Sequence, residues 1–255
     1  MFAVLIRSIL ASIISFIGFE MMVNHKDLLF WIALFLLFLL FLITVSIVAI
    51  CRIRSNRLHY IVFPLFYFLS SIVFFVFIPG QIFQQIYIFI SSFLFGAMLF
   101  YVGNFILGHT EVRKTFRHYT LFDIVVLVCG FFSYCALFGL YLFLSWPIWL
   151  LFIGALVISF FLSYYYFWYN KMAIKKNLIY YFIFSLIILE ATWAITFWST
   201  GFLARGMVLF IIFYTASGLA KHNHQKTLTS RIVKEYLATT IIALALVLGT
   251  TKWTF

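Results

Sequence analysis

The strongest constraint on this chain is a set of long apolar runs that carry no charged residue. The run from Leu28 to Ile50 has 23 residues and no charge. About 20 helical residues, at ~1.5 Å each, are enough to cross a hydrocarbon core of ~30 Å. Backbone groups in lipid must be hydrogen-bonded within their own helix or in a closed barrel, and nothing here alternates as barrel strands do. The runs therefore predict membrane-spanning helices.

Composition excludes a soluble globular protein. Of the 255 residues, 66% are hydrophobic and 9% are charged, whereas soluble domains average about 25% charged residues. So much apolar surface needs an apolar solvent, and the lipid bilayer is the first partner that we expect. We expect no nucleic acid partner.

The pattern predicts an all-α polytopic transmembrane bundle of about nine helices. The longest connectors, 108–119 and 221–235, are too short to fold alone, so we expect no soluble domain and one integral membrane domain over 1–255. The last segment is the shortest, which leaves eight or nine helices open. The predicted helices are 2–23, 28–50, 60–79, 82–107, 120–145, 147–169, 177–199, 202–220 and 236–252.

Lysine and arginine predict the orientation. With a cytoplasmic N-terminus, 14 of the 17 basic residues fall on the cytoplasmic side, and only Lys26, Arg205 and Lys252 fall outside. This bias is typical of membrane proteins. It also predicts contacts between the cytoplasmic loops and anionic lipid headgroups, because such headgroups attract Lys and Arg close to the membrane.

Glu190 is the most informative candidate for a functional residue. It lies in the apolar stretch before Trp193, and an ionisable residue at mid-membrane is expected to face the bundle interior or water. One hypothesis is a proton- or cation-coupled site or a substrate anchor there, with Trp193 near the same face. The other is a structural acid that bonds to a Ser, Thr or Tyr of a neighbouring helix.

Arg205, on the next predicted helix, is the obvious candidate partner for Glu190. In a tight hairpin, however, Arg205 would lie about 9 Å nearer the outer surface, at ~1.5 Å per residue. We therefore expect Arg205 to extend to the outer headgroups, or to form an ion pair at the outer interface with Glu20 or Asp27.

Two further polar residues lie inside predicted helices. Asp123 is about one turn into its helix, where the helix dipole favours an acid and where Arg117 or Lys114 could pair with it. Asn104 is expected to form a hydrogen bond between helices.

Metal and cofactor chemistry have no support in the sequence. Five histidines map to the inner side, yet no carboxylate or cysteine stands at a ligand spacing. We therefore expect neither a metal nor a cofactor. These histidines are His59, His109, His118, His222 and His224.

The C-terminal third resembles an uncharacterised family of polytopic membrane proteins from candidate-phyla bacteria. The resemblance implies a bacterial inner-membrane location and no particular chemistry. It is carried by Glu190, Trp193, Phe197-Trp198, Tyr214, Gly218, Arg231, Glu235-Tyr236-Leu237 and Thr250-Thr251-Lys252-Trp253.

Three functional hypotheses remain, because the chain carries no recognisable catalytic motif. The first is a non-enzymatic component or scaffold of a larger membrane assembly, with a membrane-protein partner. The second is a transporter or flippase of a lipid or small molecule that uses Glu190. The third is an intramembrane enzyme. A polar cavity around Glu190 would favour the second, and an apolar flank suited to a partner helix would favour the first.

Overall fold

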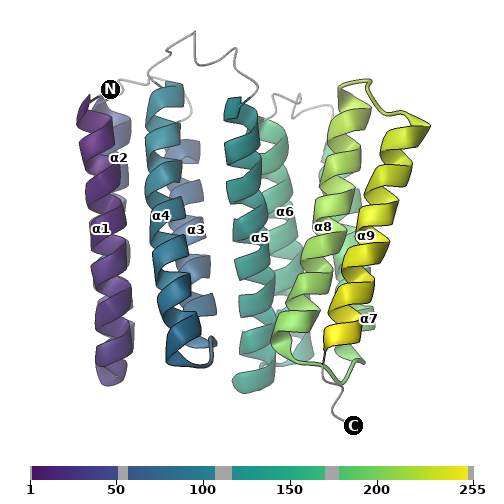
Figure 1. Cartoon of the computed structure of the whole chain (residues 1–255), viewed down its shortest axis with the longest axis horizontal. Coiled ribbons are helices and arrows are strands. Elements are labelled where there is room, and N and C mark those ends of the chain that lie inside the picture. Colours follow the sequence, from purple (N-terminus) through teal and green to yellow (C-terminus); the bar gives the residue numbers. More distant parts are fainter. Residues whose placement is uncertain (1, 51–56, 107–116, 170–177, 252–255) are drawn as a thin grey trace. The chain divides into compact units, whose positions relative to one another are not determined.

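The computed structural model describes residues 2–50, 57–106, 117–169 and 178–251, and in these ranges it contains nine α-helices and no strand (Figure 1). A short 3-10 helix, η1 (Lys26–Leu28), lies between the first two. The α-helices are α1 (Phe2–Asn24), α2 (Leu29–Ile50), α3 (Arg57–Val76), α4 (Gln81–Ile106), α5 (Arg117–Phe143), α6 (Ile148–Tyr169), α7 (Leu178–Thr196), α8 (Phe202–His224) and α9 (Ser230–Thr250).

The predicted all-α class and the nine helices are confirmed. Eight of the described helices are long and apolar enough to cross a membrane, whereas the apolar stretch Tyr181–Thr196 in α7 is shorter. The last helix, α9 (Ser230–Thr250), is one of these eight. The last helix begins at Ser230 instead of 236, because the hydroxyl of Thr229 accepts a hydrogen bond from the Ile232 amide and caps it.

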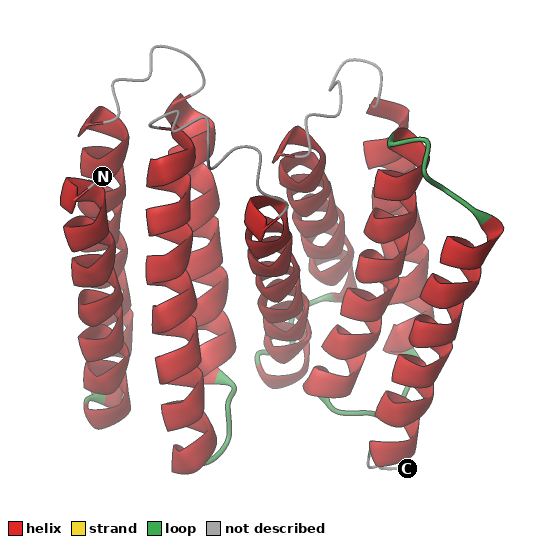
Figure 2. Cartoon of the chain, turned by 45° about the horizontal axis from the view of Figure 1, so that its top comes forward, coloured by secondary structure: helices red, strands yellow, loops and turns green. Residues whose placement is uncertain are grey.

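The chain divides into two compact units, residues 1–125 and 126–255. The first holds α1 to α4 and the start of α5, and the second holds the rest of α5 and α6 to α9. Figure 2 shows both units as helices, with the described connections as green loops. Two clusters of contacts need not be two folding domains, so one integral membrane domain over the whole chain stays a prediction.

Small residues hold α1 against α4 in the first unit. The Ser12 hydroxyl donates to the Ser92 carbonyl at 2.8 Å, and the Ser92 hydroxyl lies 3.3 Å from that of Ser15. A Cβ at Gly96 would stand 2.7 Å from the Cβ of Ser12. Glycine and serine let helix backbones approach closely in lipid, where packing and interhelical hydrogen bonds drive association.

An equally close approach joins α5 and α8 in the second unit. A Cβ built on Gly206 would lie 2.6 Å from the Cα of Cys135 and 2.7 Å from its nitrogen. Buried hydroxyls add a second link, because Tyr134 of α5 and Ser159 of α6 are hydrogen-bonded at 3.0 Å. Helix α9 differs from the others, since it packs on α8 and none of its residues is buried.

Candidate functional site

Glu190 lies on the outer surface of α7. The residue is exposed, and no side chain of the described residues forms a hydrogen bond or ion pair with it. Thr196 ends the helix six residues later, about 9 Å away at ~1.5 Å per residue. Within the second unit Glu190 therefore does not face the interior, which was one of the two expected positions; the other, a position in contact with water, stays a prediction.

The packing of α7 explains this position. Its buried residues repeat at three- and four-residue intervals, as one face of a helix does, and α6 is its closest neighbour. Glu190 is two residues beyond buried Ile188 and two before buried Thr192, so it points to the opposite side. The buried face consists of Tyr181, Phe184, Ser185, Ile188, Thr192 and Ile195.

Aromatic side chains flank Glu190 on this surface, as expected for Trp193. The Trp193 ring, 58% exposed, meets the Phe197 ring edge-to-face with centroids 5.3 Å apart. One turn before the acid, Leu186 and Ile187 are exposed as well. Glu190 is thus a single acid within an apolar stripe, which we call the α7 outer face: Phe182, Ile183, Leu186, Ile187, Glu190, Trp193 and Phe197.

Arg205 is buried in the first turns of α8, so the prediction that it extends to the headgroups is wrong. Its Nε donates to the Thr200 carbonyl at 2.9 Å, and a terminal nitrogen donates to the Trp198 carbonyl. These carbonyls belong to the connection between α7 and α8, where no helix satisfies them. The guanidinium of Arg205 therefore ties the start of α8 to the connection between α7 and α8.

Glu20 belongs to the first unit and Arg205 to the second, so the expected outer ion pair between them stays a prediction. Glu20, at the end of α1, accepts a hydrogen bond from the Gln85 amide of α4 at 3.2 Å. The contact links two neighbouring helices at their exposed ends. Glu20 and Arg205 each form hydrogen bonds within their own unit.

Asp123 and Asn104 occupy ordinary helical positions. Asp123 lies in α5, half-buried, and its expected partners Lys114 and Arg117 have side chains outside the described residues. The Oδ1 of Asn104 is buried without a hydrogen-bond partner among the described residues, and the expected bond between helices stays a prediction. The adjacent Gly103 packs against Val4 of α1, which offers no donor.

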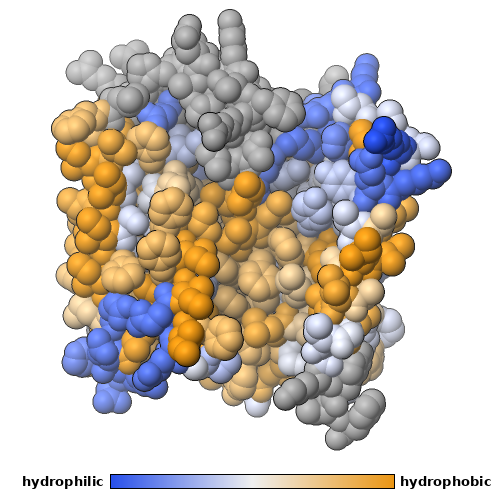
Figure 3. Space-filling view, in the orientation of Figure 1, coloured by the Kyte–Doolittle hydropathy of each residue, from blue (hydrophilic) through white to orange (hydrophobic). Residues whose placement is uncertain are grey.

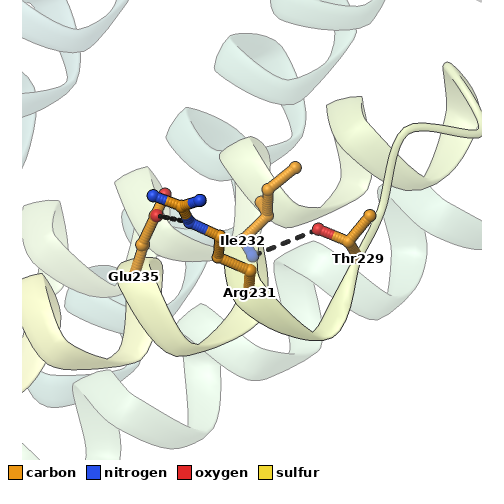
Figure 4. Close-up of polar contacts among 4 residues, drawn as sticks. All are labelled: Thr229, Arg231, Ile232 and Glu235. Carbon is orange, nitrogen blue, oxygen red and sulfur yellow. Dashed lines mark hydrogen bonds and ion pairs between the residues drawn. The ribbon is translucent and has the colours of Figure 1, made fainter.

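Basic side chains gather where α8 turns into α9. Figure 3 shows this end of the hairpin as hydrophilic above an apolar stretch. Arg231 donates through its Nε to Glu235 at 2.9 Å, one helical turn away (Figure 4). Lys226 and Lys234 are exposed and lack a partner among the described residues. We call this set the hairpin cluster: Lys221, His222, His224, Lys226, Arg231, Lys234 and Glu235.

The ring of Tyr236 packs the first turns of α9 against α8. Its ring lies so close to Gly218 that a Cβ there would stand 2.4 Å from Cε1, and it also contacts the rings of Tyr214 and His222. Nearby, the hydroxyls of Thr215 and Thr240 are 2.5 Å apart. Three residues of the resemblance, Tyr214, Gly218 and Tyr236, thus form one contact.

The described residues contain one further feature of interest, an apolar groove of about 600 Å³ in the second unit. It includes neither Glu190 nor the hairpin cluster. Its lining is Phe131, Gly201, Leu203, Ala204, Met207, Val247, Thr250 and Thr251.

Metal-binding groups do not gather in the part of the chain that the structure describes, where no three His, Cys, Asp or Glu residues lie close enough to hold an ion. His109 falls outside that part, as does the side chain of His118.

Comparison with known proteins places the chain in a family. Residues 50–250 match the model of a protein family of unknown function (DUF5656). The chain belongs to this family. No curated protein and no solved structure matches. The matched region runs from the end of α2 through α9 and contains Glu190, Arg205 and the hairpin cluster, whereas Glu20 lies outside it.

Proposed function

We propose that this DUF5656 protein is a non-enzymatic subunit of a larger membrane assembly, and that the α7 outer face is where it binds its partner. The exposed Glu190 carries the proposal. An acid without a partner costs ~2.5–3.5 kcal/mol at the centre of a membrane-spanning helix, and part of this cost applies to Glu190, about 9 Å from the end of α7. This cost disappears when a partner supplies a hydrogen-bond donor.

The chemistry of the face defines the partner. Apolar side chains surround one acid, so the matching surface is a transmembrane helix that is apolar except for one basic or hydrogen-bond-donating side chain level with Glu190. The ring pair of Trp193 and Phe197 supplies a large apolar contact beside the acid. Aromatic residues of this kind are enriched at protein interfaces.

The other two hypotheses have less support. A transporter or flippase that uses Glu190 needs the acid in a water-accessible cavity, and an intramembrane enzyme needs at least two converging titratable groups. Glu190 is exposed, and the apolar groove does not contain it. We also propose a bacterial inner-membrane location, which rests on the sequence resemblance.

Site-directed photocrosslinking in living cells tests the proposal. A benzophenone amino acid replaces Trp193 on the α7 outer face, and in a matched control it replaces Phe89, which is 66% exposed on α4. We expect a crosslink to one distinct membrane protein from position 193 and none from position 89. The crosslinked peptide should lie in a transmembrane helix with a basic or donor side chain.

Two variants then link the crosslink to the acid. Glu190→Gln keeps a hydrogen-bonding group and should retain the crosslink, whereas Glu190→Leu should abolish it. Crosslinks to lipid alone would refute the proposal that the protein is a subunit of a larger assembly. A crosslink to a second copy of this chain would refute a distinct partner, and crosslinking that persists in Glu190→Leu would remove the acid from the interface.

A further inference from the structure

The hairpin cluster lies where α8 ends and α9 begins. It carries more positive charge than the acids of the cluster neutralise. Four lysines and arginines stand between residues 221 and 235 against one acid, Glu235. Glu235 already accepts from Arg231. Lys221 lies over the Tyr166 ring, 5.9 Å from its centroid. Lys226 and Lys234 remain exposed without a partner among the described residues.

The connection that carries Lys226 is held in one conformation by its own hydrogen bonds. The amide of Lys226 donates to the Asn223 carbonyl at 3.1 Å, and that of Thr227 donates to the His222 carbonyl at 3.0 Å. The Thr227 hydroxyl and the His222 ring nitrogen lie 3.0 Å apart. The backbone at Lys226 is therefore preorganised, which reduces the entropy lost on binding an anion.

Lys226 has a backbone conformation that its residue type disfavours. Its φ is 56°, in the left-handed region where asparagine and glycine are much more common. Strained positions of this kind persist where the surrounding structure fixes them, and they are frequent at binding sites. A lysine here places an unpaired cation at the tip of the hairpin.

An exposed apolar side chain lies within the same tip. Leu228 is 40% exposed in the connection between Lys226 and Arg231. An apolar side chain among cations suits the boundary between lipid headgroups and acyl chains better than it suits water. The anion that this surface fits thus carries hydrocarbon, and both helices already enter the apolar layer below it.

We infer that the hairpin cluster binds the phosphate group of an anionic phospholipid, chiefly through Lys226 and Lys234. This inference does not depend on the function proposed for α7. Anionic lipid attracts each nearby lysine by roughly a factor of five in affinity. Loss of both unpaired lysines should then weaken binding about 25-fold.

The test compares two double variants of equal charge in lipid nanodiscs. Lys226→Asn/Lys234→Gln removes the unpaired cations and places at position 226 a residue that accepts its backbone conformation. The matched control, Lys175→Gln/Lys176→Gln, removes two lysines of another loop. The measurement is the thermal stabilisation on passing from phosphatidylcholine to mixed phosphatidylcholine and phosphatidylglycerol, with titration of the anionic fraction.

We expect the parent and the control to be stabilised by phosphatidylglycerol at similar fractions. The hairpin variant should bind it about 25-fold more weakly and gain little stability at the fraction that saturates the parent. Equal effects of the two double variants would overturn the inference, because a general response to net charge would explain them. A hairpin variant that behaves as the parent would overturn it too. Inorganic phosphate added to phosphatidylcholine discs separates the sources, and equal stabilisation by it would identify a free anion instead of a lipid.

Discussion

Replacement of Gly206 by alanine should separate two helices that touch through their backbones. The new Cβ would stand 2.6 Å from the Cα of Cys135 and 2.7 Å from its nitrogen. Real contacts of this kind need more than 3 Å, and neither atom can rotate away as a side chain would. Overpacking of an apolar core costs about 1–3 kcal/mol, and a backbone obstacle places Gly206→Ala near the upper limit, at about 3 kcal/mol.

Gly249→Ala is the matched control, since it makes the same chemical change in another helix. A Cβ at Gly249 would meet no atom within 4 Å, so the higher helix propensity of alanine should stabilise α9 by up to about 1 kcal/mol. The two variants should therefore differ by about 3–4 kcal/mol. Unfolding in mixed micelles of mild detergent and dodecyl sulfate, followed by circular dichroism, measures the difference.

The comparison of the two alanine variants can also refute the argument. A Gly206→Ala protein that unfolds at the same dodecyl sulfate fraction as the parent would mean that α5 and α8 do not approach closely at this point. Destabilisation by both variants alike would point to a general effect of alanine for glycine, unrelated to the contact with Cys135.

Two further substitutions probe polar contacts by the same unfolding assay. Arg205→Met leaves the carbonyls of Trp198 and Thr200 without their charged donor, so it should destabilise the second unit by about 2 kcal/mol. A variant as stable as the parent would show that the hairpin does not need these hydrogen bonds. Arg231→Ala breaks an ion pair whose side chains are 88% and 61% exposed, so the change should be at most about 0.5 kcal/mol, and a larger loss would mean that the pair with Glu235 is part of a wider network.

The small-residue stripe of α1 shows what the sequence predicts well. Serines and alanine recur on one face of that segment, and a serine and a glycine stand four residues apart in α4. Such residues have one structural advantage in lipid, which is close backbone approach. The contacts of Ser12, Ser92 and Gly96 are of this kind. The long apolar runs likewise predicted the helices, with ends that differ by a few residues.

The rotation of α7 about its axis was beyond prediction from the sequence alone. Apolar residues surround Glu190 on every side of that helix, so no periodic stripe indicates which face packs inward. The general rule that buried acids face the bundle interior gave the wrong side. For Arg205, the sequence gives no sign of the free carbonyls of Trp198 and Thr200, to which its guanidinium donates.

Arg205 and Glu190 differ in whether they have hydrogen-bond partners. This difference makes Arg205 a structural residue and Glu190 a candidate for binding. Arg205 has found acceptors within its own hairpin, so its charge is compensated as soon as α7 and α8 pair. Glu190, only 15 positions earlier, has none among the described residues. A helix that is apolar all round could turn in lipid at little cost and bring its acid inward. The inner face of α7 is instead filled by Ile188, Thr192 and their neighbours, which is why we propose that another molecule compensates the acid.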